Sequence, residues 1–182
     1  MIQKTTLILM SLVMLLGVTS LAQAEVKQVT LRIDGLACPF CAFGLEKKLK
    51  KLEGYRSIKV FINEGKVNIG WKQDKPLKLS AIYAAVKAAG FTIRNIKGDF
   101  VGTIEKEDDQ FFLTMESTGQ RFYLREASEP LAKDERKPGQ ALTKATKKRL
   151  KKLASKNKTV VITGYVHDKD GITLGIGELK VQ

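Results

Sequence analysis

The chain has few residues of the types that usually crosslink a fold or hold a metal. It contains two cysteines and one histidine in 182 residues, and only one of its four methionines, Met115, follows residue 24. Two cysteines form at most one disulfide, which excludes a disulfide-rich scaffold. One histidine cannot supply both imidazoles of a Cys2His2 zinc site, and one methionine excludes a methionine-rich copper site.

Acidic residues are also scarce. The chain has 32 Lys and Arg against 19 Asp and Glu, a net charge of +13. A basic chain suggests nucleic acid as the first partner to consider. The start of the sequence argues against this partner, because it predicts export from the cytosol.

Residues 1–24 have the three parts of a cleavable export signal. Lys4 is followed by an apolar run over residues 7–18 and then by Ala22-Gln23-Ala24. The run is shorter than the ~20 residues of a membrane span. We therefore expect cleavage after Ala24 and a periplasmic protein with no nucleic-acid partner. Its thiols would be exposed to oxidation there.

Residues 25–98 alternate between strand and helix signals. Val26–Ile33 alternates apolar and polar residues, which predicts a half-buried strand. Leucines at helical spacing between lysines predict an amphipathic helix over Phe40–Leu52. The later elements are expected at Ile58–Ile62, Val67–Trp71, Leu79–Ala89 (a helix) and Phe91–Ile96. This βαββαβ order predicts a ferredoxin-like domain.

Residues 99–182 predict a second, mostly β domain, which makes the chain α+β. Short strands are expected at 100–104, 110–115, 120–124, 159–166 and 172–181. An exposed loop is expected over 126–140, and a lysine-rich helix over about 141–156. Five strands with a helix before the fourth predict a small, OB-like barrel.

The positive charge is divided unequally between the two segments. Residues 25–98 carry 15 basic and 6 acidic residues, a net +9, whereas residues 99–182 carry 16 and 13, a net +3. Residues 144–158 nevertheless contain eight cations and no acid. Such a run is usually a solvated face, although it also suits phosphate polymers or an anionic membrane surface.

Both cysteines lie in one short motif, Gly35-Leu36-Ala37-Cys38-Pro39-Phe40-Cys41, between the first strand and the first helix. Two thiols three positions apart can turn toward one point, and thiolates prefer soft ions such as Cu(I), Hg(II), Cd(II) and Zn(II). A helix start favours the thiolate over the thiol. Cys38 and Cys41 are therefore the candidate metal ligands.

This segment resembles the heavy-metal-associated domain family, which includes periplasmic mercuric-ion-binding proteins and copper chaperones. The family motif is Gly-Met-x-Cys-x-x-Cys before helix one of a βαββαβ fold, and here it reads Gly-Leu-Ala-Cys-Pro-Phe-Cys. The resemblance implies that Cys38 and Cys41 bind the metal, that Leu36 packs beneath the loop and that Phe91 shields it. Leu36 replaces the family methionine, and we expect altered loop mobility with binding retained.

Two other interpretations of the cysteine pair stay open. An exported Cys-Pro-Phe-Cys suits a thiol-disulfide oxidoreductase. Against it, the element order differs from a thioredoxin-like fold, and Pro76 is the only other proline before residue 130. The second alternative is a structural disulfide or a pair without function. Metal binding remains the leading hypothesis because motif and context agree.

The resulting expectation is a periplasmic carrier, not an enzyme, since no nucleophile is accompanied by a base. It would hold one soft ion, Hg(II) or Cu(I), with Zn(II) or Cd(II) also compatible. It would pass the ion to a membrane metal transporter or another thiol-bearing acceptor, and the dithiol also permits a transient dimer that shares the ion. His167 is expected at the surface and Trp71 in the core.

Overall fold

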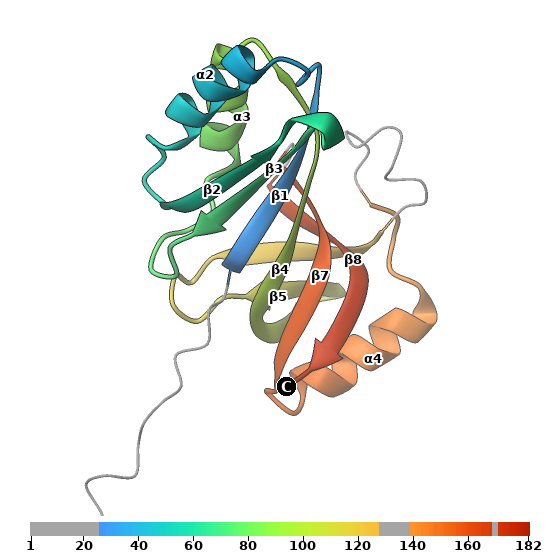
Figure 1. The fold of residues 1–182 in the computed structure, drawn as a ribbon. Helices are drawn as coiled ribbons and strands as arrows, with labels where there is room; N and C mark the ends of the chain where they lie inside the picture. Colours follow the sequence, from blue (N-terminus) through green and yellow to red (C-terminus); the bar gives the residue numbers. More distant parts are fainter. Residues whose placement is uncertain (1–25, 128–138, 169–170) are drawn as a thin grey trace, which may run out of the picture.

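The computed structural model describes residues 26–127, 139–168 and 171–182. The predicted export signal lies outside these residues, as does most of the loop expected over 126–140. Figure 1 shows two parts, with helices α2 and α3 at one end of the molecule and helix α4 at the other. Within the described residues, no helix is both long and apolar enough to cross a membrane.

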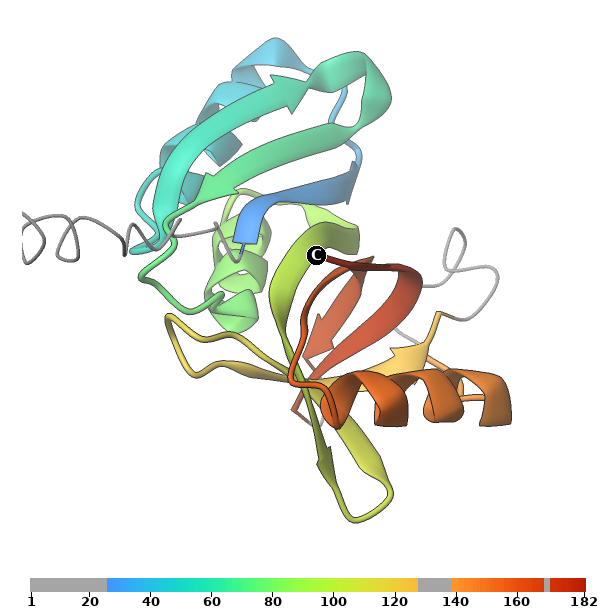
Figure 2. The same ribbon diagram turned by 90° about the horizontal axis from the view of Figure 1, so that it is seen from below.

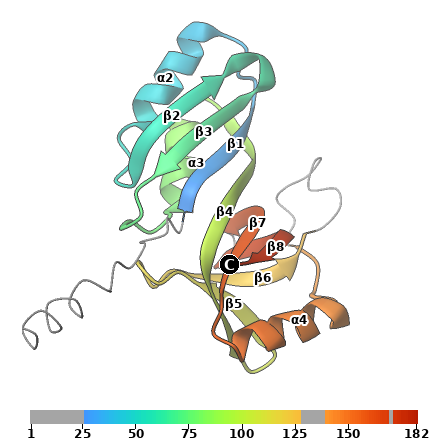
Figure 3. The same ribbon diagram turned by 60° about the horizontal axis from the view of Figure 1, so that its bottom comes forward.

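The first part is a four-stranded antiparallel sheet with two helices on one face, as Figure 3 shows. Its strand order is β2-β3-β1-β4, and α2 and α3 contact each other. The elements, in chain order, are β1 (Val26–Asp34), α2 (Pro39–Leu49), β2 (Tyr55–Phe61), η1 (Ile62–Glu64), β3 (Lys66–Trp71), α3 (Leu79–Ala88) and β4 (Thr92–Glu107). This is the expected ferredoxin-like βαββαβ fold.

Apolar residues on the inner faces build the core beneath the helices. Leu31 of β1 and Ile69 of β3 are fully buried, as are Leu45 of α2 and Ile82 of α3. Trp71 is also buried, as predicted, and its Nε1 donates to the Lys75 carbonyl at 3.0 Å. The alternation of β1 and the helical spacing of α2 therefore face one common core.

The second part is a closed five-stranded barrel. Its order is β4-β5-β6-β8-β7, and β7 pairs back onto β4 to close the ring. All pairs are antiparallel except β6 with β8, which run parallel. The remaining elements are β5 (Gln110–Thr114), β6 (Arg121–Glu126), α4 (Lys144–Ala154), β7 (Thr159–Asp168) and β8 (Ile172–Val181). Phe100 and Phe122 pack inside it, with ring centroids 5.1 Å apart.

One long strand belongs to both parts. The sequence predicts two strands, Phe91–Ile96 and 100–104, on either side of a boundary at residue 98, but β4 runs unbroken from Thr92 to Glu107. Its first half pairs with β1, and Lys97–Thr103 pairs with β7. Gly98, the last residue of the predicted first domain, is buried within the strand beside the ring of Phe100. The two parts therefore join through shared sheet, without a linker.

The surface position expected for His167 is wrong. The side chain lies near the end of β7 and is 9% exposed. Its Nε2 is buried without a hydrogen-bond partner among the described residues, and burial lowers the pKa of this histidine from its ordinary value. The sequence pattern misleads here because two consecutive residues of β7, Val166 and His167, are both buried.

Candidate metal site

The two cysteines lie where β1 leads into α2, as the motif predicts. Cys38 is the N-cap residue of α2, in extended backbone, and Pro39 begins the helix. Proline is well suited to this position because the first helical N–H has no partner within the helix. Gly35 has a φ of 79°, which a residue with a side chain rarely adopts. The turn at Gly35 therefore allows β1 to lead directly into the cysteine loop.

Buried packing fixes the base of the loop. Leu36 is 4% exposed, which confirms its expected packing role. The Ile33 N–H donates to the Gly65 carbonyl at 2.8 Å and ties the end of β1 to the turn after η1. Phe91 is half-buried against the core. The loop thus begins on a rigid base while its thiols stay accessible.

The thiols differ in their protonation. Both cysteines are free; Cys38 is half-buried and Cys41 is exposed. Hydrogen bonding from the Cys41 backbone amide, then from the Cys41 thiol and the Phe40 amide, lowers the pKa of Cys38. The pKa of the Cys41 thiol is raised, chiefly because this thiol donates a hydrogen bond to Cys38. Cys38 is consequently the first of the two to become a thiolate.

The first turns of α2 expose two large apolar side chains, which the sequence patterns did not reveal. Phe40 is 89% exposed and Phe43 is 70% exposed, whereas Ala42, Leu45 and Leu49 are the buried positions of α2. The helical phase of those three positions is the signal that could have placed both phenylalanines on the outer face. Two large apolar rings are therefore exposed on the first turns of α2, the helix that carries Cys41.

Positive charge continues along α2 beyond the phenylalanines. Lys50 pairs with Glu46 at 2.6 Å. Lys47, Lys48 and Lys51 are exposed and form no ion pair with any described residue. Lys47 follows Cys41 by six residues, or about 9 Å along the helix axis. The dithiol, the two phenylalanines and these lysines thus share one end of the molecule.

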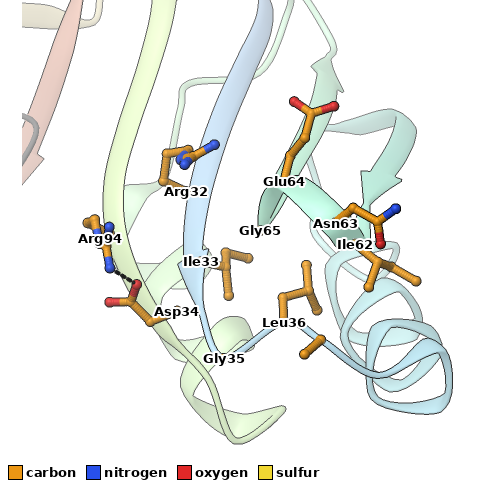
Figure 4. Close-up of a pocket in the computed structure, with 11 residues that line it drawn as sticks. Arg32, Ile33, Asp34, Gly35, Leu36, Ile62, Asn63, Glu64, Gly65 and Arg94 are labelled. Atoms are coloured by element: carbon orange, nitrogen blue, oxygen red, sulfur yellow. Dashed lines mark ion pairs between the residues drawn. The ribbon is translucent and has the colours of Figure 1, made fainter.

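A polar pocket of about 390 Å³ adjoins the other side of the loop. Figure 4 shows Asp34 of β1 and Arg94 of β4 paired at one side of the pocket, where their charged groups are 2.5 Å apart. The cysteines do not line this pocket. Asp34 and Arg94 instead join the end of β1 to the start of β4 at the base of the loop.

The two thiols are the only metal-donor side chains that the described residues bring together at this site. No group of three or more Cys, His, Asp or Glu side chains that could hold a metal occurs among them. Coordination by two sulfur ligands suits Cu(I) and Hg(II), whereas tetrahedral Zn(II) needs two further ligands. The site fits a soft ion bound at an accessible edge.

A ferredoxin-like domain with a dithiol before its first helix defines a class of metal-binding domains, and comparison with known proteins identifies the family. Residues 30–92 match the heavy-metal-associated domain, and this segment of the chain is such a domain. The match ends at the first residue of β4, so it does not include the barrel.

The relatives match this chain over a segment about as long as one such domain. The copper chaperone CopZ of Bacillus subtilis (strain 168) is 27% identical over 67 residues, which cover 37% of this chain and 96% of the chaperone. The solved structure of a CopZ metallochaperone aligns with 24% identity and a TM-score of 0.34, over 36% of this chain and 97% of that chain.

Proposed function

We propose that this protein is an exported carrier of a soft metal ion, which Cys38 and Cys41 bind together and release to an acceptor protein. The observation that supports it best is the pair of free, accessible thiols at the start of α2 in a heavy-metal-associated domain. The export signal predicted over residues 1–24 supports a periplasmic location. No chemistry on carbon or phosphorus is needed, so we propose no enzymatic activity.

The ion we propose is Cu(I), with Hg(II) as the second candidate. The donor set favours ions that accept two thiolates, and one relative with a matching domain is a copper chaperone. Zn(II) or Cd(II) would complete its coordination only with ligands from elsewhere, such as the dithiol of a second copy. A transient dimer bridged by the ion follows from the same reasoning.

Transfer would proceed by exchange of sulfur ligands. An acceptor thiol loses its proton and attacks the ion, and one carrier sulfur leaves and takes up a proton. A second exchange completes the transfer, and no oxidation state changes. The open edge left by two-coordinate binding admits the acceptor thiols without release of the free ion.

The acceptor would dock on the surface around Cys41. Phe40 and Phe43 offer apolar contact area, and Lys47, Lys48 and Lys51 offer positive charge. Buried aromatic anchors and complementary charge are common in transient interfaces. We propose a membrane metal transporter, or another thiol-bearing metal acceptor, with acidic residues around its own cysteines.

The second part supports a more specific assignment of fold. Its five strands close in the order first, second, third, fifth, fourth, with a helix between the third and fourth. We assign this arrangement to the OB-type barrels. Because β4 belongs to both parts, the barrel would hold the metal-binding domain in a fixed orientation.

Metal titration of the reduced protein under nitrogen tests the proposal. We expect one equivalent of Cu(I) or Hg(II) to bind per chain, and the double variant Cys38→Ser, Cys41→Ser to lose it. Stoichiometric binding that survives in the double variant would contradict the site. The variant Phe40→Ala, Phe43→Ala serves as the matched control: it should bind the ion normally but transfer it more slowly to a dithiol acceptor domain.

The alternative, thiol-disulfide exchange, has some support from the lowered pKa of Cys38, which oxidoreductases also use. Reduction of insulin by the metal-free protein separates the two functions. A rate above that of a small dithiol would favour the oxidoreductase, and a rate no greater than that of the dithiol would favour the carrier.

A further inference from the structure

Helix α4 and the turn that follows it carry a dense group of unpaired cations. We define the α4 lysine surface as six exposed residues: Lys144, Lys148, Lys151, Lys152, Lys156 and Lys158. None of them forms an ion pair with a carboxylate of the described residues, although Lys147 in the same helix pairs with Asp109 at 2.5 Å. The charge of this surface is therefore available to a partner.

The lysines face solvent because the opposite side of the helix is packed on the barrel. Leu150 and Leu153 are buried, and the Arg149 guanidinium donates to the Leu179 carbonyl at 2.8 Å. Lys144, Lys148 and Lys151 follow one another at spacings of four and three residues, which places them on one stripe of the helix. Figure 2 shows α4, in orange, lying along the outside of the barrel.

This arrangement of charge opposes the stability of the helix. Lys144 and Lys148 repel each other at a spacing of four residues, as do Lys148 and Lys152. Lys144 also lies in the first turn, where the helix dipole disfavours a cation, and that turn contains no acidic residue. Lys151 and Lys152 lie in the last turn, where a cation suits the helix dipole, but a helix needed only to cover the barrel would be more stable with glutamate in place of Lys144 or Lys148. The clustering therefore points to a binding role.

We propose that the α4 lysine surface binds the anionic headgroups of a phospholipid bilayer. Lysines near such a surface each add to the affinity, and a flat row of them can contact many headgroups at once. The leucines of α4 are buried, so the helix cannot insert, and binding is peripheral and electrostatic. The protein thus rests on the bilayer through the outer side of α4.

The composition of the surface favours a bilayer over the other polyanions. Residues 144–158 contain no aromatic residue on which a base could stack. Their only arginine, Arg149, donates from Nη2 to the barrel, so the free charge of this surface comes mainly from lysines, which bind phosphates as point charges and lack the planar fork that reads base edges. An acidic protein would require apolar anchors at the centre of the interface, and the apolar residues of α4 face inward.

The orientation follows from the positions of the helices. Figures 1 and 3 show α4 at the end of the molecule opposite α2. A protein bound through α4 presents the Cys38 and Cys41 loop away from the lipid, toward the soluble domains of its neighbours. This inference involves different residues from the metal site, so either proposal can fail without the other.

Sedimentation of the full chain with vesicles tests the inference. We expect binding to phosphatidylglycerol vesicles at low salt, its loss at high salt, and no comparable binding to phosphatidylcholine vesicles. The variant Lys144→Gln, Lys148→Gln, Lys151→Gln should bind phosphatidylglycerol about a hundredfold more weakly. It should melt no lower than the wild type, because it removes repulsion within α4 and no contact with the barrel.

The matched control is Lys47→Gln, Lys48→Gln, Lys51→Gln, which removes the same charge from α2 and the turn after it and should bind nearly as the wild type does. All three proteins keep the same first 24 residues, so any binding through that segment is equal among them and does not contribute to the differences between the variants. Equal loss in the two variants, or no binding by the wild type, overturns the proposal. Tighter α4-dependent binding to duplex DNA than to phosphatidylglycerol also overturns it.

Discussion

The side chain of Gln120, in the barrel, hydrogen-bonds to both backbone groups of Leu77, in the loop before α3. The Leu77 N–H donates to Oε1 at 2.8 Å, and Nε2 donates to the Leu77 carbonyl at 3.0 Å. Nearby, the Ser117 hydroxyl donates to the Gln73 carbonyl at 2.7 Å. The turn between β5 and β6 thus holds a loop of the metal-binding domain at a second point, besides β4.

Removing this connection should destabilise the whole molecule. Gln120→Ala leaves two backbone groups of the buried Leu77 without partners, and we expect a loss of about 1–3 kcal/mol in the free energy of unfolding. Urea unfolding followed by the fluorescence of Trp71, the only tryptophan, measures it. Gln110→Ala, an exposed glutamine at the other end of β5, is the control and should change little. Equal effects would show that Gln120 does not connect the two parts.

Two glycine substitutions should have opposite effects. A Cβ at Gly54 would lie 2.0 Å from Cε2 of Trp71, whereas a Cβ at Gly44, within α2, would meet no atom within 4 Å. We expect Gly54→Ala to destabilise the protein by about 1–3 kcal/mol and to shift the Trp71 emission to longer wavelength. Gly44→Ala should stabilise it by up to about 1 kcal/mol, because alanine favours the helix. Stabilisation by both variants would contradict the packing described for Trp71.

The two thiols should react at different rates. Because its neighbours lower the pKa of Cys38 and raise that of Cys41, Cys38 has the larger thiolate fraction near neutral pH. Iodoacetamide should therefore modify Cys38 first in the reduced, metal-free protein, as peptide mass spectrometry can show. Cys41→Ala should slow the reaction of Cys38, since it removes the thiol that donates to it. Faster labelling of Cys41 would contradict this order.

His167 should make the protein less stable in mild acid. Its pKa is lowered in the folded state from its ordinary 6.5, so the unfolded chain binds the proton more tightly. The stability is full above the unfolded pKa and falls as the pH drops below about 6.5 toward the folded value. Unfolding of the wild type and of His167→Leu at about pH 7 and pH 5 measures this difference. The wild type should lose more stability than the variant, and equal losses would contradict the assignment.

Much of the fold could be predicted because its signals are local. Alternation over 26–33, helical spacing over 40–52 and the turn residues between elements reflect the geometry of single strands and helices. The candidate site could be predicted equally well, because Cys38 and Cys41 are three residues apart at a helix start. At a helix start this spacing brings both thiols close together without contacts from distant parts of the chain.

The sequence by itself therefore determined the order of the elements, the dithiol and the cationic run of α4. Only the tertiary structure decided that Gly98 continues a strand, that β7 closes the barrel on β4, and that His167 is buried. It also decided that Phe40 and Phe43 stay exposed on the same helix as Cys41. These outcomes depend on pairing and packing between residues far apart in the chain, and a local pattern carries no record of those contacts.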